Sequence, residues 1–293
     1  MERDIKARTA VITGASSGMG LFAAKALAAE GWRIIALGRD PQRTEVARAE
    51  IGAAAAPGVA VDMLRADLSL IADVVRVSNQ VMAKTDRIDV LLNNAGGTAA
   101  HQVMTSEGNE ATFAGNHLGH FHLTNRLLPL LKAAAARSAP GDTRIINMSS
   151  AAHLSVAGLD WDDLQMFDNF VPIRAYCNAK LANILFTRAL ARRLSGTGIV
   201  VHAMHPGAVN TNFWSHADEG TKSYGQSISL ITTEQGAETL VWLATAAEPG
   251  KTSGSYYHER KPIPPSAAAQ DDEAAERLWV ESEKWVARSG VRA

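Results

Sequence analysis

Tyr176 and Lys180 stand four residues apart and are the pair in this sequence best suited to proton transfer. The apolar spacing of residues 181–194 predicts a helix, and side chains four residues apart on a helix share one face, with Cβ atoms about 5–6 Å apart. A lysine ammonium at that distance favours a charged phenolate, so we expect Lys180 to lower the pKa of Tyr176 toward neutral pH. The pair predicts a general acid/base.

Glycines gather directly after the first apolar run of the chain, residues 9–13. Residues 13–20 read TGASSGMG and lead into an alanine-rich helical pattern. Gly14 allows a sharp turn, and Gly18 and Gly20 leave no side chain where a pyrophosphate must approach the start of a helix. The free N–H groups and positive dipole end of that helix bind phosphate. The pattern predicts a dinucleotide site at Gly14, Ser16, Ser17, Gly18, Met19 and Gly20.

The end of the second apolar run, residues 33–37, indicates which dinucleotide is bound. NAD enzymes usually keep a carboxylate there for the ribose hydroxyls. Gly38 stands in the place expected for that acid, and the guanidinium of Arg39 can bind a 2′-phosphate. Asp40 is better explained as a helix N-cap before Pro41. The sequence therefore favours NADP(H) over NAD(H).

Short apolar runs alternate with helical patterns along residues 9–204, as in βαβ units around a parallel sheet. Seven strands are predicted, at 9–13, 33–37, 59–65, 90–93, 144–148, 199–204 and 254–257. We expect a single α/β domain over residues 1–293, a doubly wound Rossmann fold whose mostly parallel seven-stranded sheet carries helices on both faces. Residues 207–232 and 249–266 are predicted loops, the first being a substrate loop. A C-terminal helical extension, 267–293, contains an amphipathic helix that covers core or a partner subunit.

The composition excludes several classes of protein. The chain is 46% hydrophobic, and 29 Lys plus Arg balance 30 Asp plus Glu, so it lacks the basic face of a nucleic-acid or anionic-lipid binder. No apolar run is long enough to span a bilayer, and the N-terminus leaves no room for a signal peptide, so we expect a cytoplasmic protein that binds no membrane. With Cys177 as the only cysteine, redox chemistry needs a bound cofactor.

These features occur in an order that is similar to that of the short-chain dehydrogenases/reductases. The glycine turn is followed by Asn93-Asn94-Ala95-Gly96, Asn116, Ser150, Tyr176 with Lys180, and Pro206-Gly207. The resemblance covers nearly the whole chain. Residues 116–121, NHLGHF, and 176–183, YCNAKLAN, look like the retinol-dehydrogenase-like branch of that family.

The resemblance implies a role for each matching residue. Tyr176 would be the acid/base, and Lys180 would bind the nicotinamide ribose and lower the tyrosine's pKa. Ser150 would hydrogen-bond the substrate oxygen, and Asn116 would kink its helix and hold a water leading to Lys180. The other cofactor contacts would be Asp67 and Leu68 after the third strand, Asn94, Ala95 and Gly96 on the adenosine side, and Pro206, Gly207, Val209 and Thr211 near the carboxamide. Asp67 has an alternative role as the N-cap of the next helix.

The serine is assigned by motif alone. Twenty-five residues separate Ser150 from Tyr176, more than is usual in the family at large. Ser149 and Ser155 therefore stay alternatives to Ser150.

Aromatic residues follow this serine and the Pro206-Gly207 motif. Trp161, Phe167 and Phe170 lie in the long stretch before Tyr176, which forms either a wall of the substrate mouth or a surface flap. Phe213 and Trp214 are better candidates to cover an apolar substrate.

Three histidines, His117, His120 and His122, crowd into one motif. Such clusters can bind zinc, but no acid or cysteine stands at ligand spacing beside them. We expect neutral structural histidines.

The sequence thus predicts an NADP(H)-dependent oxidoreductase that interconverts an alcohol and a carbonyl on a small apolar molecule, as a homodimer or homotetramer. One alternative is a catalytically silent protein that senses NADP(H). Another is a sugar-nucleotide epimerase or dehydratase, which uses the same tyrosine and lysine. The complete set of Asn116, Ser150, Tyr176 and Lys180 argues against the first, and the short region after residue 232 argues against the second.

Overall fold

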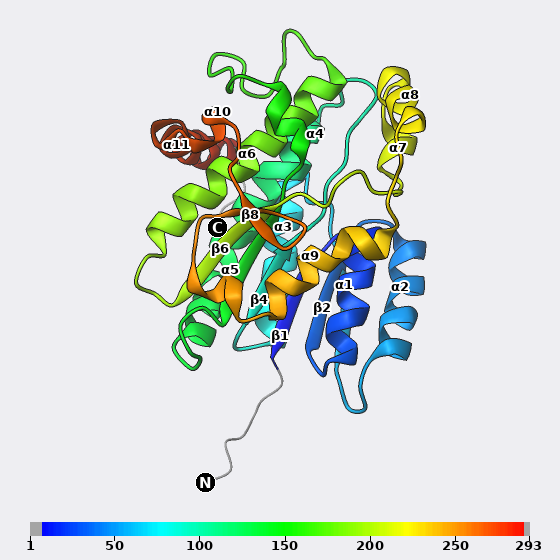
Figure 1. The fold of residues 1–293 in the computed structure, drawn as a ribbon, viewed down its shortest axis with the longest axis vertical. Helices are drawn as coiled ribbons and strands as arrows, with labels where there is room; N and C mark the ends of the chain where they lie inside the picture. The colour runs from blue at the N-terminus through cyan, green and yellow to red at the C-terminus, as the bar shows by residue number, and fades with distance from the viewer. Residues whose placement is uncertain (1–7, 290–293) are drawn as a thin grey trace.

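One sheet of eight strands runs through the protein, for which the computed structural model describes residues 8–289 (Figure 1). The strand order is β3-β2-β1-β4-β5-β6-β7-β8, and all neighbouring strands are parallel except β7 and β8. The predicted doubly wound α/β fold is confirmed, with eight strands in place of seven.

The strands are β1 (Thr9–Thr13), β2 (Arg33–Gly38), β3 (Val61–Arg65), β4 (Val90–Asn93), β5 (Thr143–Met148), β6 (Ile199–Met204), β7 (Tyr256–His258) and β8 (Lys261–Ile263). The α-helices are α1 (Gly18–Ala29), α2 (Pro41–Ala54), α3 (Ile71–Lys84), α4 (Ala111–Phe113), α5 (Gly119–Ala135), α6 (Pro172–Arg193), α7 (Phe213–His216), α8 (Glu219–Ser227), α9 (Thr233–Thr245), α10 (Ala267–Gln270) and α11 (Asp272–Arg288). A π-helical turn, η1 (Ala114–Leu118), joins α4 to α5, and 3₁₀ turns form η2 (Ala151–Ser155) and η3 (Glu248–Lys251).

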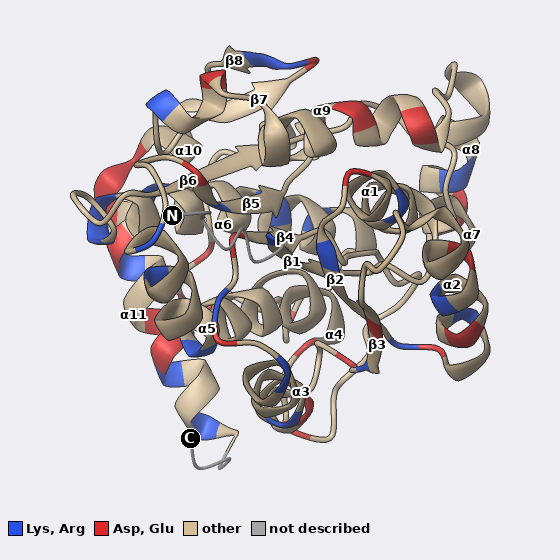
Figure 2. Ribbon diagram, turned by 90° about the horizontal axis from the view of Figure 1, so that it is seen from below, with Lys and Arg blue, Asp and Glu red and all other residues tan. Residues whose placement is uncertain are grey.

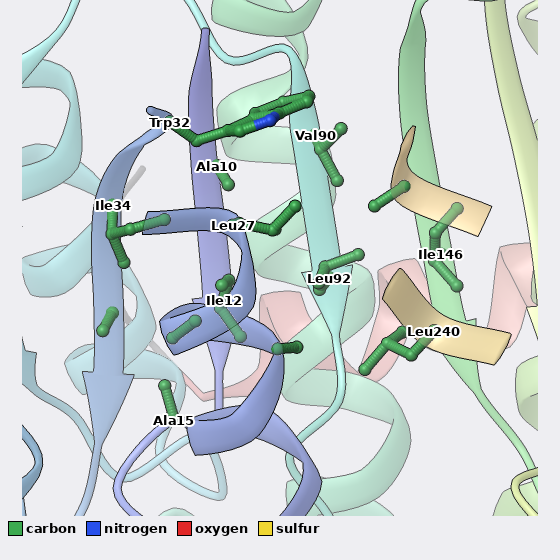
Figure 3. Close-up of a cluster of buried hydrophobic side chains, with 14 of the residues drawn as sticks. Ala10, Ile12, Ala15, Leu27, Trp32, Ile34, Val90, Leu92, Ile146 and Leu240 are labelled. Carbon is green, nitrogen blue, oxygen red and sulfur yellow. The ribbon is translucent and has the colours of Figure 1, made fainter. Parts of the chain in front are cut away.

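Helices cover both faces of the sheet, as Figure 2 shows with the sheet between two helical layers. α1, α2 and α9 pack on one face, and α3, α5 and α6 on the other. In the first layer, Leu27 of α1 lies near Ile12 and Leu92 of the central strands, and Leu240 of α9 lies near Ile146 of β5 (Figure 3). The strand order reverses between β1 and β4, so the loops at their carboxyl ends diverge and leave a crevice.

Local signals at helix ends are confirmed. Pro41 begins α2, and the Asp40 side chain accepts a hydrogen bond from the backbone N–H of Arg43 at 2.8 Å. Gly31 follows α1 with a φ of +88°, which glycine tolerates without strain.

The strand predicted at 254–257 corresponds to β7, whereas β8 lies in the part of 249–266 that was predicted to be a loop. β7 and β8 form a hairpin, and its turn residues Glu259 and Arg260 have φ of 47° and 61°. A two-residue hairpin turn of type I′ needs both residues in this left-handed region, which usually selects Asn or Gly. Because neither is present here, the sequence carries no hairpin signal. Pro262 lies in β8, where an edge strand tolerates it.

The predicted loop over 207–232 is also partly helical, since it contains α7 and α8. Asp218 caps α8 by accepting the backbone N–H of Thr221 at 3.1 Å. These helices have 4 and 9 residues, too few to show a helical period clearly.

The C-terminal helix α11 lies along α6. Trp279 of α11 packs its ring against Phe121 and Phe186, with centroids 4.9 and 5.9 Å apart. Ion pairs flank this contact and join Arg188, Arg192 and Arg193 of α6 to Asp272 and Glu276 of α11. The helix therefore covers core of its own chain. Within residues 8–289, no helix has the length and apolar character needed to cross a membrane.

Candidate active site

The turn between β1 and α1 leaves its backbone bare. Gly14 and Gly18 have φ of +66° and +57°, a conformation that favours glycine. A Cβ on Gly14 would lie 2.8 Å from the Cα of Ala95, and one on Gly20 would strike the carbonyl oxygen of Gly14. Within the described chain, the side chain of the N-cap Ser17 makes no capping hydrogen bond. The N–H groups that begin α1 are therefore free for a phosphate, and the turn fits a dinucleotide.

A cavity of about 680 Å³ lies beside this turn at the carboxyl ends of β1, β2 and β4. The predicted catalytic residue Asn116 lines it, as do many residues predicted to hold the cofactor: Gly14, Ser16, Ser17, Gly18, Met19, Arg39, Asp67, Leu68, Asn94, Ala95, Gly96 and Thr211. Its lining does not include Gly20, Ser150, Tyr176, Lys180, Pro206, Gly207 or Val209. A second cavity, of about 640 Å³, lies at the other end of the strands and has none of these residues in its lining.

Two arginines border the cavity at the end of β2. Arg39 is 68% exposed at its side chain and lies 4.0 Å from the Asp67 carboxylate, and Arg43 is the second. Gly38 is buried, and a Cβ there would lie 2.5 Å from the Thr44 methyl and 2.8 Å from the Ser16 Cβ. A carboxylate side chain at position 38 therefore needs its neighbours to shift, whereas Arg39 and Arg43 already line the cavity.

Asp67 does not cap the next helix, so this alternative role is wrong. Its carboxylate accepts the backbone N–H and the hydroxyl of Ser69, at 3.0 and 2.7 Å. Leu70 is the N-cap of α3, and the carboxylate of Glu107 accepts the N–H groups of the first helical residue, Ile71, and of the next.

The segment after β4 is fixed to β1 by one hydroxyl. Oγ1 of Thr13 accepts the backbone N–H groups of Asn94 and Ala95, both at 2.9 Å. Next in the chain, a Cβ on Gly96 would lie 2.5 Å from Oδ1 of Asn116 and 3.0 Å from Nζ of Lys180. Gly96 thus lies between the cavity and Lys180, and because it is a glycine, no side chain stands between them.

Asn116 lies in the π-helical turn η1, so its helix is distorted at this residue. Its side-chain amide donates to the carbonyls of Thr112 and Gly97, at 2.7 and 2.8 Å, and accepts the N–H of Gly97 at 3.2 Å. The amide therefore holds the segment that lines the cavity.

Tyr176 and Lys180 share one face of α6, with Nζ 5.3 Å from the centre of the phenol ring. Lys180 is 2% exposed and donates to the carbonyl oxygen of Met148 at 3.3 Å. Asn183 donates to the same oxygen at 3.0 Å. The carbonyl oxygen at the end of β5 thus holds the lysine in place one helical turn from the tyrosine.

Burial dominates the electrostatics of this pair. It raises the pKa of Tyr176 to about 12, against a lowering effect from the hydrogen bond with the Ser150 side chain. Burial also lowers the pKa of Lys180 to about 7. The expected lowering of the tyrosine's pKa is therefore not met, because burial of the phenol outweighs the hydrogen bond with Ser150. The phenol keeps its proton and can donate it.

Two adjacent serines have different surroundings. Ser149 is buried and donates its hydroxyl to the carbonyl of Lys180 at 2.7 Å. Ser150 is half-buried, its hydroxyl accepts the N–H of Ala152 at 3.1 Å, and its side chain hydrogen-bonds Tyr176. Ser155 ends η2 and is exposed. The geometry therefore favours Ser150 as the partner of the phenol.

Phe213 lies over the phenol, with ring centroids 4.8 Å apart. Beside it, the indole of Trp214 donates to the carbonyl of Val209 at 2.9 Å and packs closely against Gly225 of α8. Helices α7 and α8 thus form a cover next to Tyr176.

The long stretch before Tyr176 packs against the C-terminal helix. Phe167 contacts the ring of Trp285 at 5.6 Å, and the guanidinium of Arg277 lies 4.7 Å from the ring of Trp161. These aromatic residues and Phe170 are absent from the lining of the 680 Å³ cavity.

His153 and Thr13 support the site although the sequence analysis did not single them out. Nδ1 of His153 lies 2.7 Å from the carbonyl of Ser150, and its Nε2 accepts the N–H of Ser266 at 3.1 Å. The second contact leaves the proton on Nδ1, which donates to Ser150. A partner 113 residues away cannot be read from local sequence, whereas the place of Thr13 directly before Gly14 was a usable signal.

The sequence was compared with protein families and with known proteins, and both comparisons match the same family. The family described as short chain dehydrogenase matches residues 8–222. Retinol dehydrogenase 13 of Homo sapiens is 38% identical over 295 residues, which covers 96% of this chain and 85% of that protein.

Two solved structures are similar over most of the fold. The Pseudomonas aeruginosa RhlG/NADP active-site complex has a TM-score of 0.68 and 28% identity, covering 85% of this chain and 93% of that chain. The 3-ketoacyl-(acyl-carrier-protein) reductase from Brucella melitensis, complexed with NADH, has a TM-score of 0.67 and 25% identity, covering 86% and 96%.

Proposed function

The chain belongs to the short-chain dehydrogenase family, and from this premise we propose an NADP(H)-dependent oxidoreductase in which Tyr176 is the general acid/base on a small apolar substrate. As a member of this family, the protein is an oxidoreductase that acts on CH–OH or C=O groups with a nicotinamide cofactor. The retinol-dehydrogenase-like branch is shared with the human relative.

One observation carries the assignment of Tyr176. The bare backbone of Gly96 separates the dinucleotide cavity from Lys180, and Lys180 lies one helical turn from the phenol. A nicotinamide ribose in that cavity would meet the lysine, and the phenol would stand next to the ring.

The residues divide the chemistry as follows. The nicotinamide, when bound, supplies or accepts the hydride. In reduction Tyr176 gives its proton to the carbonyl oxygen, which the hydroxyl of Ser150 orients. The ammonium of Lys180 stabilises the phenolate that remains, and Asn116 holds the cavity-lining segment in place. In oxidation the same proton moves in the opposite direction.

Two features support the preference for NADP(H). Position 38 is a glycine whose neighbours leave no room for a carboxylate side chain, and two arginines lie beside it. A 2′-phosphate would be neutralised by Arg39 and Arg43, and position 38 carries glycine in place of an acid that would repel it. The aromatic cover of Phe213 and Trp214 supports an apolar substrate. We further propose that residues 1–293 form one domain.

Tyr176→Phe tests the assignment. We expect the turnover of NADPH with a panel of aldehydes and ketones, followed by its absorbance, to fall by about 10²–10⁴-fold with little change in NADPH binding. Tyr257→Phe, which removes a phenol hydroxyl on the other face of the sheet, is the matched control and should keep wild-type turnover. Wild-type turnover in Tyr176→Phe would refute the role of Tyr176. NADPH binding without turnover of any compound would instead favour a nucleotide sensor.

A further inference from the structure

The NHLGHF motif contains His117 and His120, and His122 follows it. These three histidines have three different environments. His117 is buried, and its Nε2 lies 2.8 Å from the hydroxyl of Ser282 on α11. His122 is partly exposed. His120 is 2% exposed, and its Nε2 lies 2.9 Å from Oγ1 of Thr13, the residue before Gly14. Burial lowers the pKa of each of the three, in agreement with the expected neutral rings.

His120 joins two parts of the candidate site. Its Nδ1 lies 3.0 Å from the carbonyl oxygen of Asn116, and its Nε2 lies 2.9 Å from Oγ1 of Thr13. Thr13 in turn holds the backbone N–H groups of Asn94 and Ala95. One imidazole therefore connects Asn116 to the segment that lines the cavity.

The hydrogen bonds fix the protonation of this imidazole. A threonine hydroxyl has one proton and two lone pairs, and both lone pairs of Thr13 are used by the two backbone N–H groups. The carbonyl oxygen of Asn116 can only accept, so Nδ1 carries the proton and Nε2 is the acceptor. The hydroxyl proton of Thr13 has two possible acceptors, Nε2 at 2.9 Å and the carbonyl oxygen of Leu92 at 3.3 Å, and Nε2 is the nearer. An imidazolium would have a second N–H with no acceptor. The pKa of His120 is lowered to about 4 by burial, which agrees with a neutral ring.

Asn116 also contacts the cavity-lining segment directly. Its amide holds both backbone groups of Gly97, and a Cβ on Gly96 would touch both Asn116 and Lys180. The cavity-lining segment 94–97 is thus held at its start through Thr13 and at its end by Asn116. His120 is the side chain that fixes these two supports relative to each other.

We propose that His120 is a positioning residue, which sets the segment 94–97 against Asn116 and so places the dinucleotide beside Lys180. This proposal rests on the proposed function for its effect on turnover, but its effect on NADPH binding does not depend on catalysis.

The test compares His120→Leu with His117→Leu, since the two histidines are equally buried, lie three residues apart and differ in their partners. Both variants lose a buried hydrogen-bonding ring, so both are expected to unfold at lower temperature. Titration with NADPH, followed by its fluorescence, should show a dissociation constant raised about tenfold in His120→Leu and unchanged in His117→Leu. kcat should fall about tenfold in His120→Leu while KM for the carbonyl substrate stays within twofold.

A conservative variant separates hydrogen bonding from packing. The side-chain amide of His120→Gln reaches about as far as Nε2 and can accept from Thr13, so it should recover most of the NADPH affinity. The proposal is overturned if His117→Leu weakens NADPH binding as much as His120→Leu does. It is equally overturned if His120→Leu binds NADPH normally, or if His120→Gln binds no better than His120→Leu. Failure of Tyr176→Phe to abolish turnover would refute the proposed function and leave these binding results standing.

Discussion

The ring of Phe213 lies over the ring of Tyr176, with centroids 4.8 Å apart and planes inclined by 52°. Phe213 begins α7 and Tyr176 lies in the first turns of α6, so the contact joins the cover of the site to its acid/base. Burial, to which this ring contributes, raises the pKa of Tyr176 to about 12. The cover therefore affects both access to the phenol and its proton affinity.

Phe213→Ala should change both properties. Loss of the apolar cover is expected to raise KM for apolar substrates by at least about tenfold. Because less burial favours the phenolate, the pKa of Tyr176 should fall, and the pH at which alcohol oxidation becomes half-maximal should move down. The measurement is kcat/KM for oxidation as a function of pH.

Phe167→Ala is the control for this prediction. Phe167 packs on Trp285, and the cavity lining does not include it, so its loss should lower stability and leave KM unchanged. An equal rise of KM in both variants would mean that the stretch before Tyr176 forms a wall of the substrate mouth.

Arg39→Ala should weaken the use of NADPH selectively. A charge-assisted contact to a 2′-phosphate is worth about 1.5–3 kcal/mol, so kcat/KM for NADPH should fall about 10–100-fold. The value for NADH should stay within twofold, because NADH has no 2′-phosphate. Arg48→Ala is the control, since Arg48 pairs with Glu45 on the exposed side of α2 and is not among the cavity-lining residues. Equal losses with both cofactors would contradict the proposed preference.

Local signals in the sequence were sufficient for most of the fold. The glycine turn and the Asp40 cap depend on residues within a few positions of each other, and all but one of the strands were located. The hairpin strand β8 was missed because Glu259 and Arg260 adopt left-handed conformations that their residue types do not signal.

The electrostatics of the site could not be predicted in the same way. The pKa of Lys180 depends on burial by elements distant in sequence, such as the end of β5 at Met148. The sequence placed Lys180 at the right spacing from Tyr176 but did not predict that burial would lower the pKa of the lysine. The role of His120 likewise depends on Thr13, 107 residues away.

Acid should destabilise the protein below pH 6.5. Burial lowers the pKa of His117 to about 3 and those of His120, His122 and His205 to about 4, from an ordinary value of 6.5. Between pH 6.5 and 4 the unfolded chain binds protons that the folded protein excludes, so stability falls as the pH falls. Each imidazole contributes a slope of at most about 1.4 kcal/mol per pH unit.

Urea unfolding at pH 7, 6 and 5 measures this effect. His117→Leu removes one of the four groups, so its unfolding free energy should depend on pH less steeply than that of the wild type by about one imidazole's share. Equal slopes in the two proteins would show that His117 is not held neutral by the fold.

Adjacent tyrosines on β7 offer a test of an unusual buried hydroxyl. Tyr256 and Tyr257 are 3% and 4% exposed and face opposite sides of the sheet. The hydroxyl of Tyr257 lies 3.4 Å from that of Thr252, whereas the Tyr256 hydroxyl has no hydrogen-bond partner among residues 8–289. A buried donor without a partner costs about 1–3 kcal/mol.

Tyr256→Phe removes that cost while it keeps the ring, which packs at 5.1 Å from His153 and 5.6 Å from His205. The free energy of unfolding in urea should therefore rise by about 1 kcal/mol. Tyr257→Phe loses a partnered hydroxyl and should be destabilised by about 0.5–1.5 kcal/mol. Because the two changes delete the same atom from neighbouring residues, opposite signs can only come from the surroundings of each hydroxyl. A loss of stability in Tyr256→Phe equal to that in Tyr257→Phe would mean that the hydroxyl of Tyr256 makes a stabilising hydrogen bond in solution.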